Sequence, residues 1–474
     1  MKKLLAAALA LCMLALAACA PKAAYRKITA EEAYRMMREA DDYILLDTRT
    51  EEEYADKHIE GALLIPEYEI GARAAAALPD RHALILVYCR SGRRSEIAAR
   101  ELVGLGYTNV YDFGGIIDWP YETGGPTMSK LEKMEDIIVY ADGGYSAFPS
   151  IVRTTDGNYL LAFRHAPGPD GNSHLDPESA TWLMNSPDGQ DWGEPRELRR
   201  PNGYAAQDPV LNVLEDGTVL MTVFFWRFTG AEQRQLLERT LPDGIDMHSI
   251  RGMTAYFGGS YSYLSRNHGE SWEGPHLITE NYAIRGRCAQ LPDGTVLAPM
   301  YSRTGIVLFA SRDGGLTWEP YSFAGGPLGK SKTAHEPALF RTQSGRILCF
   351  IRTNEEMYYC QSVDDGQSFS APVPTGLPGS VPYDALQLPS GNVYLAYGQR
   401  REPYGIRALL LDGECNGISL DRERILRDDG LGSDISYVSS VILPGGDILT
   451  AYYYYTAENE QRRYIAGTVL REIS

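Results

Sequence analysis

The sequence predicts a multidomain protein in which an α/β unit with a parallel sheet is followed by an all-β, six-bladed propeller. The 474 residues exceed what one ordinary hydrophobic core can hold, so two or more domains are expected. Apolar runs alternate with helical patterns over residues 24–125, which is typical of a parallel sheet with crossover helices. Beyond residue 137, a Ser-x-Asp-x-Gly-x-x-Trp pattern recurs four times and indicates a repeated sheet unit.

The composition is that of a soluble globular protein. Charged residues make up 23% and hydrophobic residues 44% of the chain. The formal net charge of -17 argues against nucleic acid as a partner, because phosphate binding needs a basic surface. No metal-binding cluster is evident in the sequence, and we expect neither a metal nor a cofactor.

The N-terminus has the pattern of an export signal. Lys2 and Lys3 precede an apolar run over residues 4–18, which is too short for a confident membrane span. The run ends in Leu16-Ala-Ala-Cys19, which resembles the lipobox of bacterial lipoproteins. The resemblance implies a signal peptide over residues 1–19, a lipid on Cys19 and an extracytoplasmic protein anchored to the membrane, at the cell surface or the periplasmic face. The alternative is a plain signal peptide with a chance cysteine.

Five cysteines remain beyond this segment, without metal-ligand spacing. Because five is odd, at least one thiol is expected to be free. They are Cys89, Cys288, Cys349, Cys360 and Cys415.

The α/β unit is predicted over residues 24–125. Residues 43–47 and 83–88 have the pattern of strands, and residues 30–39 and 95–105 that of amphipathic helices. Cys89 stands where a strand ends, which is where ligands usually bind in such sheets. A glycine-containing loop and a helix N-terminus follow, and their amides and the nearby arginines should favour the thiolate. The loop residues are Arg90, Ser91, Gly92, Arg93, Arg94 and Ser95.

This unit resembles the rhodanese family over its whole length. Besides the Cys89 loop, the resemblance is carried by Asp47-Thr-Arg49, Glu53-Tyr54, His58-Ile-Glu-Gly61-Ala62, Ile65-Pro66, and Gly114-Gly115 ahead of Trp119. It implies that Cys89 carries a sulfane sulfur as a persulfide, taken from a small donor and passed to an acceptor, while Asp47 and Arg49 brace the loop. The loop length suits a sulfurtransferase better than a phosphatase. The alternative is a rhodanese fold kept as a binding or regulatory module.

A linker is expected over residues 126–136 and the propeller over residues 137–474. A second repeat, in which a proline or equivalent turn leads into two strands joined by a glycine-containing turn, occurs six times and predicts six blades. The last strand, residues 464–472, should close the ring beside the strand near Ile137, so that no sheet edge is left unpaired. The repeats open at Phe148-Pro149, Asp208-Pro209, Cys288-Ala289, Glu336-Pro337, Tyr383-Asp384 and Tyr437-Val438.

The copies of the Ser-x-Asp pattern have the chemistry of tight hairpins. The Asp carboxylate accepts hydrogen bonds from the turn amides, the Gly supplies a positive φ, and the aromatic ring packs between strands. The copies resemble the Asp boxes of the sialidase superfamily, which are structural and carry no catalysis. They span residues 186–192, 265–272, 311–318 and 362–369.

Functional side chains are expected where the blades open, because these positions converge on the axis. The polar candidates there and in adjoining loops are Asp176, Asp208, Arg285, Arg287, Glu336, Arg352, Asp384, Arg400, Arg407 and Tyr437. Sialidases attack the anomeric carbon with a tyrosine activated by a glutamate, and an aspartate serves as acid and base. The resemblance implies these roles for Tyr437, Glu336 and Asp176, with Asp170 and Glu178 as rivals of Asp176.

Sialidases also hold the carboxylate of the substrate with three arginines, and the set is incomplete here. Arg352 and Arg407 are placed like the second and third, but Ala147 stands where the first is expected. Losing a charged contact of this kind costs several kcal/mol of binding. Either another arginine replaces it or the substrate is not an ordinary sialoside. The candidates for substrate binding are Arg352, Arg407, Arg164, Asp208, Arg285, Arg287 and Asp384.

The sequence thus indicates an exported retaining glycosidase of the sialidase superfamily, acting on a glycan or glycoside, fused to a sulfurtransferase domain. The alternative is a carbohydrate-binding propeller without turnover, with activity only at Cys89. A phenol beside a carboxylate favours catalysis, because binding alone does not need it. The distance between Tyr437 and Glu336 therefore separates the two hypotheses.

Overall fold

The computed structural model divides the chain into two compact units between Ser129 and Lys130, and each is described by itself. The expected signal peptide with Cys19, the linker residues 126–129 and Asp170 lie outside the described residues. The described residues are 24–40, 43–59, 61–121, 130–167, 174–241, 245–302, 305–324, 334–379, 381–416, 418, 420–459 and 462–473.

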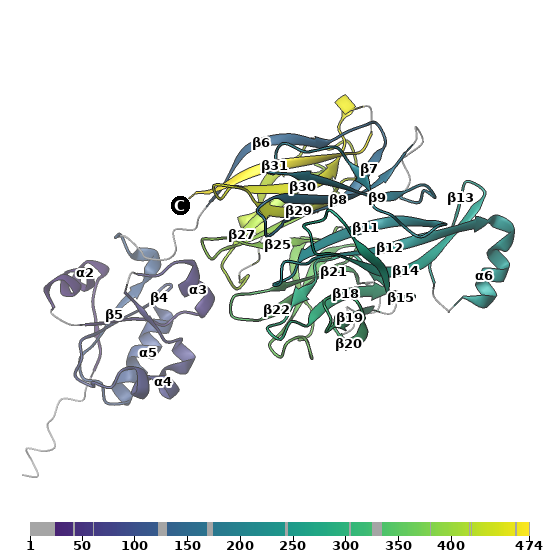
Figure 1. Ribbon diagram of the computed structural model, residues 1–474. Helices are drawn as coiled ribbons and strands as arrows, with labels where there is room; N and C mark the ends of the chain where they lie inside the picture. Colours follow the sequence, from purple (N-terminus) through teal and green to yellow (C-terminus); the bar gives the residue numbers. More distant parts are fainter. Residues whose placement is uncertain are drawn as a thin grey trace, which may run out of the picture. The chain divides into compact units, whose positions relative to one another are not determined.

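The first unit contains a parallel sheet with helices on both faces (Figure 1). Its strands are β1 (Arg26–Lys27), β2 (Ile44–Asp47), β3 (Leu63–Leu64), β4 (Ile85–Cys89) and β5 (Val110–Gly115). Its helices are α2 (Ala30–Glu39), α3 (Glu51–Asp56), α4 (Ile70–Ala77) and α5 (Arg93–Gly104). The strand order is β1-β5-β4-β2-β3, and the paired strands run parallel. This confirms the α/β fold expected from the sequence.

Alternation of side chains along the strands gives the sheet two apolar faces. Leu46 and Val87 pack with α4 and α5 on one face, whereas Leu45 and Leu86 pack with α2 on the other. The strand that ends in Cys89 is therefore buried from both sides, and its end is held in a rigid position.

The second unit is a propeller of six antiparallel sheets, as the sequence predicts. Blade 1 contains β7 (Tyr145–Arg153), β8 (Tyr159–Ala166), β9 (Ala180–Ser186) and β10 (Arg196–Glu197). Blade 2 contains β11 (Tyr204–Val213), β12 (Val219–Gly230), β13 (Met247–Ile250), β14 (Met253–Ser265) and β15 (Glu273–Thr279), with α6 (Arg234–Thr240) between β12 and β13. Blade 3 contains β16 (Ala283–Ile284), β17 (Ala289–Gln290), β18 (Val296–Ser302), β19 (Gly305–Ser311) and β20 (Glu319–Phe323). Blade 4 contains β21 (His335–Arg341), β22 (Ile347–Arg352), β23 (Glu356–Ser362) and β24 (Val373–Pro378). Blade 5 contains β25 (Asp384–Gln387), β26 (Val393–Gln399), β27 (Gly405–Leu411) and β28 (Arg424–Arg427). Blade 6 contains β29 (Ser436–Ile442), β30 (Ile448–Tyr454), β31 (Tyr464–Ile473) and β6 (Lys130–Tyr140).

The ring closes where β6 pairs with β31, so the blue first strand lies beside the yellow last strand in Figure 1. Ile138 is the partner of Ala466 in this pairing, which agrees with the closure expected from the sequence. The propeller nevertheless begins earlier than expected, because β6 already occupies residues 130–136 of the expected linker. These residues are mostly exposed, and an outer strand of this kind lacks the apolar alternation that would reveal it.

The Asp boxes form the turns β9–β10, β14–β15, β19–β20 and β23–β24. In the first, the Asp188 carboxylate accepts the amides of Gln190 and Asp191, each at 2.8 Å. The box glycines have positive φ and no room for a side chain: a Cβ would lie 2.5–2.8 Å from a leucine of the preceding blade. Each box therefore fastens its blade to the one before it. The glycine and leucine pairs are Gly189 and Leu443, Gly269 and Leu160, Gly315 and Leu220, and Gly366 and Leu297.

Candidate active site

Four blades open with a strained residue that points into the same region. In each, the first strand has one residue more than its partner strand, which makes a β-bulge. A residue other than glycine with positive φ stands in the bulge, at a cost of about 1–3 kcal/mol each. Bulges of this kind re-aim side chains beside functional sites. The four residues are Phe148 (φ 57°), Asp208 (φ 47°), Glu336 (φ 41°) and Tyr437 (φ 52°).

Tyr437 of blade 6 and Glu336 of blade 4 are in direct contact. The Tyr437 hydroxyl donates to Glu336 Oε1 at 2.8 Å, and Arg352 Nη1 lies 2.6 Å from Glu336 Oε2. Arg352 Nη1 also donates to the Tyr437 oxygen at 3.1 Å. Burial alone would raise the pKa of Glu336, but Arg352 and the phenol bring it below its usual value. Burial and the Glu336 charge raise the pKa of Tyr437. The pair is therefore a carboxylate that accepts a hydrogen bond from a neutral phenol.

Two further arginines lie against the ring of Tyr437. The guanidinium carbons of Arg285 and Arg400 are 5.1 and 5.2 Å from the ring centroid. Arg400 is held by Tyr453, whose hydroxyl accepts from Nη2 at 2.7 Å. Arg285 is 5% exposed, and its Nε and Nη2 have no hydrogen-bond partner in the described part of the protein. With Arg352, three guanidinium groups from blades 3, 4 and 5 surround the phenol, and cations at an aromatic face stabilise developing negative charge on it.

Asp208 is the most perturbed carboxyl group of this cluster. It is 3% exposed, and burial raises its pKa to about 7, although Arg285 acts against this and Glu336 adds to it. Gln207 Nε2 donates to its Oδ1 at 3.3 Å. The group thus keeps its proton to a higher pH than an ordinary aspartate, and in the protonated form it can donate as well as accept a hydrogen bond.

Asp176 and Arg164 lie on the blade 1 side of the site. Asp176 Oδ1 accepts the Glu178 amide at 2.9 Å, and Oδ2 lies 3.3 Å from Arg251 Nη1. Arg164 is fully buried and directly opposite Ala147 in the pairing of β7 with β8. Burial lowers its pKa. A guanidinium group thus stands beside the position of the missing first arginine.

Arg407 does not reach this cluster, unlike the expectation from the sequence. On β27 it donates to the carbonyls of Ile406 at 3.1 Å and Pro403 at 3.2 Å, and it lies 3.6 Å from Glu423. It stabilises the outer part of blade 5. Arg400, directly after β26, is the blade 5 arginine beside Tyr437.

Arg287 and Asp384, which the sequence suggests for substrate binding, form an ion pair with each other. Arg287 Nε donates to Asp384 Oδ1 at 2.5 Å, and Nη2 donates to Ser439 Oγ and the Ser440 carbonyl, each at 3.1 Å. Asp384 Oδ2 accepts the Ser440 amide at 2.7 Å. These contacts join blades 3, 5 and 6, so the ion pair holds the inner strands together and both groups are already engaged.

Asp434 is a site residue that no sequence motif marked. Its carboxylate accepts from the hydroxyls of Tyr145 at 3.0 Å and Tyr453 at 2.9 Å, and from Arg463 Nε at 3.0 Å. His174 Nε2 lies 3.0 Å away. Burial acts against ionisation, but these donors hold the pKa of Asp434 well below its usual range. The group anchors the Tyr453 hydroxyl that in turn holds Arg400.

Phe148 opens the first blade repeat, and the sequence pattern predicts no function for it. Its ring is 4.7 Å from that of Tyr437 and 5.4 Å from that of His174. It therefore forms an apolar wall on the blade 1 side of the phenol.

In the first unit, the Cys89 loop has the arrangement expected from the sequence. The Gly92 amide donates to Cys89 Sγ at 3.1 Å. Arg94 pairs with Glu53 through contacts of 2.6 and 2.7 Å, and Arg49 Nη2 donates to Asp47 at 2.7 Å. These two ion pairs hold the loop and the neighbouring strand end. Ser95 is buried, whereas Arg90, Ser91 and Arg93 are exposed around the thiol.

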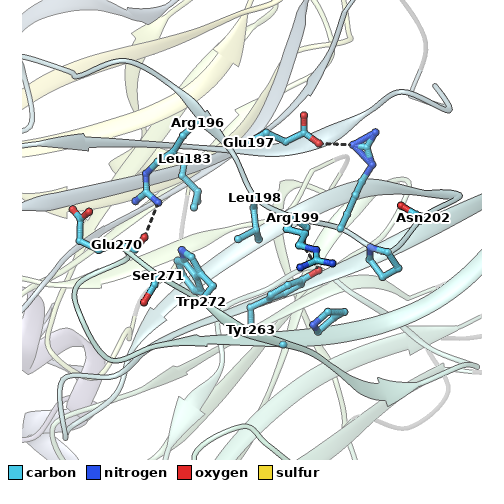
Figure 2. A pocket seen from close by; sticks show the side chains of 14 residues that line it. Leu183, Arg196, Glu197, Leu198, Arg199, Asn202, Tyr263, Glu270, Ser271 and Trp272 are labelled. Atoms are coloured by element: carbon cyan, nitrogen blue, oxygen red, sulfur yellow. Dashed lines mark hydrogen bonds and ion pairs between the residues drawn. The ribbon is translucent and has the colours of Figure 1, made fainter.

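A surface groove of about 670 Å³ lies away from this chemistry, between the outer parts of blades 1 and 2 (Figure 2). Three of its charged side chains are engaged: Arg200 pairs with Glu197 at 2.9 Å, and Arg196 donates to the Glu270 carbonyl at 3.3 Å. It shares no residue with the cluster around Tyr437.

The described residues contain no group of three or more His, Cys, Asp or Glu side chains that could hold a metal ion. Within the same ranges, no helix has the length and apolar character needed to cross a membrane.

Fold and site together define a protein with a thiol at a strand end in one unit and a phenol–carboxylate pair in a propeller. Residues 29–121 match the family of rhodanese-like domains, and residues 245–449 match the BNR repeat-like domain. Thiosulfate sulfurtransferase PspE of Escherichia coli (strain K12) is 41% identical over 73 residues, which are 15% of this chain and 70% of that protein. The chain therefore belongs to the rhodanese-like family through its first unit, and its second unit is a six-bladed propeller with a BNR repeat-like domain.

Solved structures resemble the propeller. A protein of unknown function from Dyadobacter fermentans DSM 18053 is 30% identical with a TM-score of 0.65, covering 73% of this chain and 99% of that one. The NanB sialidase of Streptococcus pneumoniae is 16% identical with a TM-score of 0.53, covering 71% and 70%. An α-L-arabinofuranosidase of Fusarium graminearum is 13% identical with a TM-score of 0.51, covering 72% and 98%. At these identities the two glycosidases show the fold alone.

Proposed function

We propose that the propeller is an exo-acting, retaining glycosidase with Tyr437 as nucleophile, Glu336 as its base and Asp176 as acid and base. The observation that carries the proposal is the 2.8 Å hydrogen bond from the Tyr437 hydroxyl to Glu336. The phenol oxygen attacks the anomeric carbon while its proton passes to Glu336, and the bond to the leaving group breaks as Asp176 protonates the departing oxygen. Water, deprotonated by Asp176, then attacks the anomeric carbon, the bond from the sugar to the Tyr437 oxygen breaks, and that oxygen takes its proton back from Glu336, so the sugar leaves with retention.

The cations around the pair favour an anionic sugar. Arg352, Arg400 and Arg285 come from three blades, and Arg285 keeps two nitrogens without a hydrogen-bond partner among the described residues. Guanidinium groups bind carboxylates bidentately, and a neutral phenol avoids the repulsion that a carboxylate nucleophile would meet beside an anionic sugar. We infer that Arg285 supplies the charge that Ala147 cannot.

The test is hydrolysis of 4-methylumbelliferyl glycosides by the full chain, with N-acetylneuraminic acid as the anionic sugar and α-L-arabinofuranose as the neutral one. Tyr437→Phe should lose activity by more than about a thousandfold, because the nucleophile is removed. Tyr452→Phe is the matched control, a buried tyrosine of the same blade whose hydroxyl bonds Thr468 at 2.6 Å. Equal hydrolysis by the wild type and Tyr437→Phe would refute Tyr437 as the nucleophile, and no hydrolysis of either glycoside by the wild type would leave a binding propeller as the better hypothesis.

For the first unit we infer sulfur transfer at Cys89. The thiolate attacks the outer sulfur of thiosulfate, a sulfur–sulfur bond forms, and sulfite leaves with the electron pair. The Gly92 amide, 3.1 Å from Sγ, and the loop around it are placed to hold the resulting persulfide. Cyanide then removes the outer sulfur as thiocyanate. Cys89→Ser should abolish thiocyanate formation and Cys288→Ser should leave it intact; turnover that survives Cys89→Ser would refute the assignment.

We also propose that the chain is a lipoprotein anchored through Cys19, on the strength of the lipobox-like sequence Leu16-Ala-Ala-Cys19. Bacteria that express the full chain and are fed radiolabelled palmitate should label it, and Cys19→Ser should remove the label. Equal labelling of both would contradict the proposal.

A further inference from the structure

Blade 4 contains two buried cysteines on neighbouring strands. Cys349 on β22 and Cys360 on β23 are direct partners in the antiparallel pairing, and both are 0% exposed. They belong to an apolar cluster with residues of blade 3, which includes Leu297 and Leu308. Both are free thiols.

The geometry of this pairing matches that of a disulfide. Directly opposed residues of antiparallel strands have Cα atoms about 4.5–5.5 Å apart, and disulfides need about 4.4–6.8 Å. Directly opposed side chains lie on the same face of the sheet, and the neighbouring Cys360 side chain and then burial raise the pKa of the Cys349 thiol. Cys288, in blade 3, and Cys415, after β27 in blade 5, have no cysteine opposite them in the strand pairings.

We propose that Cys349 and Cys360 are a disulfide site, which a small-molecule disulfide such as oxidised glutathione closes. One thiolate attacks a glutathione sulfur and releases one glutathione thiolate. The second thiolate attacks the resulting mixed disulfide and releases the other. Two thiols are thereby oxidised to one disulfide, one oxidised glutathione is reduced to two glutathione molecules, and these take up the two protons. Because the pair is buried, the reaction proceeds during folding or while the blade is open.

The cross-link lies within the strands that carry the candidate site. β22 ends in Arg352 three residues after Cys349, and its other neighbour, β21, carries Glu336. Closing the disulfide fixes the β22–β23 hairpin and restricts the unfolded chain. We therefore expect the oxidised protein to unfold at a higher temperature than the reduced one, by a few degrees.

The test is a mass map of thiols, which does not depend on the proposed glycosidase activity. The full chain is incubated with oxidised glutathione in urea below its unfolding midpoint, then denatured, alkylated and digested. We expect one peptide pair linked through Cys349 and Cys360, present also in Cys288→Ser and absent from Cys360→Ser. Protein secreted into an oxidising bacterial periplasm is mapped in parallel. In this second sample the disulfide can form while the chain first folds, without any exposure to urea.

Linkage of Cys349 to Cys360 in either sample supports the proposal. Alkylated or separately glutathionylated Cys349 and Cys360 in both samples would overturn it, as would predominant pairing of either with Cys288 or Cys415.

Discussion

Asp208→Asn gives a prediction whose magnitude follows from the structure. In the folded protein burial raises the pKa of Asp208 to about 7, whereas an unfolded aspartate has a pKa of about 3.9. Between these values the unfolded chain has lost the proton and the folded chain keeps it, so the free energy of unfolding falls as the pH rises. The difference of about three pH units corresponds to about 4 kcal/mol.

Asparagine has no such proton and nearly the same shape. The variant should therefore gain stability relative to the wild type, by up to about 4 kcal/mol between pH 4 and pH 8. Hydrogen exchange of β12 peptides in increasing urea measures the free energy of unfolding of the propeller at each pH. Asp216→Asn, which removes a carboxylate from an exposed turn of the same blade, controls for the loss of charge alone. A constant difference between wild type and Asp208→Asn from pH 4 to pH 8 would refute the reasoning, and would mean that Arg285 keeps Asp208 ionised.

Three further predictions concern the contacts that organise the propeller. Arg400→Gln should lower kcat/KM on the best glycoside by at least about thirtyfold, whereas Arg407→Gln should mainly lower the melting temperature. A loss of kcat/KM in Arg407→Gln but not in Arg400→Gln would mean that Arg407, and not Arg400, acts in the site. Arg287→Met leaves its buried carboxylate partner unpaired and should cost about 3–5 kcal/mol of unfolding free energy in denaturant titrations, and a cost near zero would contradict its role in joining blades. Gly189→Ala should destabilise by about 1–3 kcal/mol more than Gly157→Ala, because both glycines have positive φ but only Gly189 is packed against a leucine of the preceding blade; equal losses would contradict that packing role.

The blades could be predicted from sequence because each opens with the same local pattern. Asp208-Pro209 and Glu336-Pro337 stand at equivalent bulges, and a pattern that repeats locally is visible without the fold. The start of the propeller could not be predicted, because its first strand carries no such local pattern. The outer strand β6 is held by its pairing with β31, more than 300 residues away, and its exposed residues carry no alternation.

The site was only partly predictable because side-chain direction depends on register. Tyr437 and Glu336 stand at recognisable blade openings, and the structure brings them together. Arg400 and Arg407 lie in the same blade, and the sequence spacing does not say which faces the axis. In the pairing of β26 with β27, Arg407 is opposite Tyr397 and turns to the Glu423 side. The contact of Asp434 with Tyr453 likewise exists only once the strands of blade 6 are paired.

The most direct test of the proposed mechanism is to trap the sugar on its nucleophile. A fluorinated glycosyl fluoride of N-acetylneuraminic acid, or of whichever sugar the hydrolysis panel selects, forms the covalent intermediate and slows its breakdown. We expect peptide mapping of the treated full chain to find one sugar on the peptide that contains Tyr437, and none on Tyr437→Phe. A sugar attached to Glu336 or another carboxylate, or hydrolysis of the panel's best glycoside without any adduct at Tyr437, would contradict the proposed nucleophile.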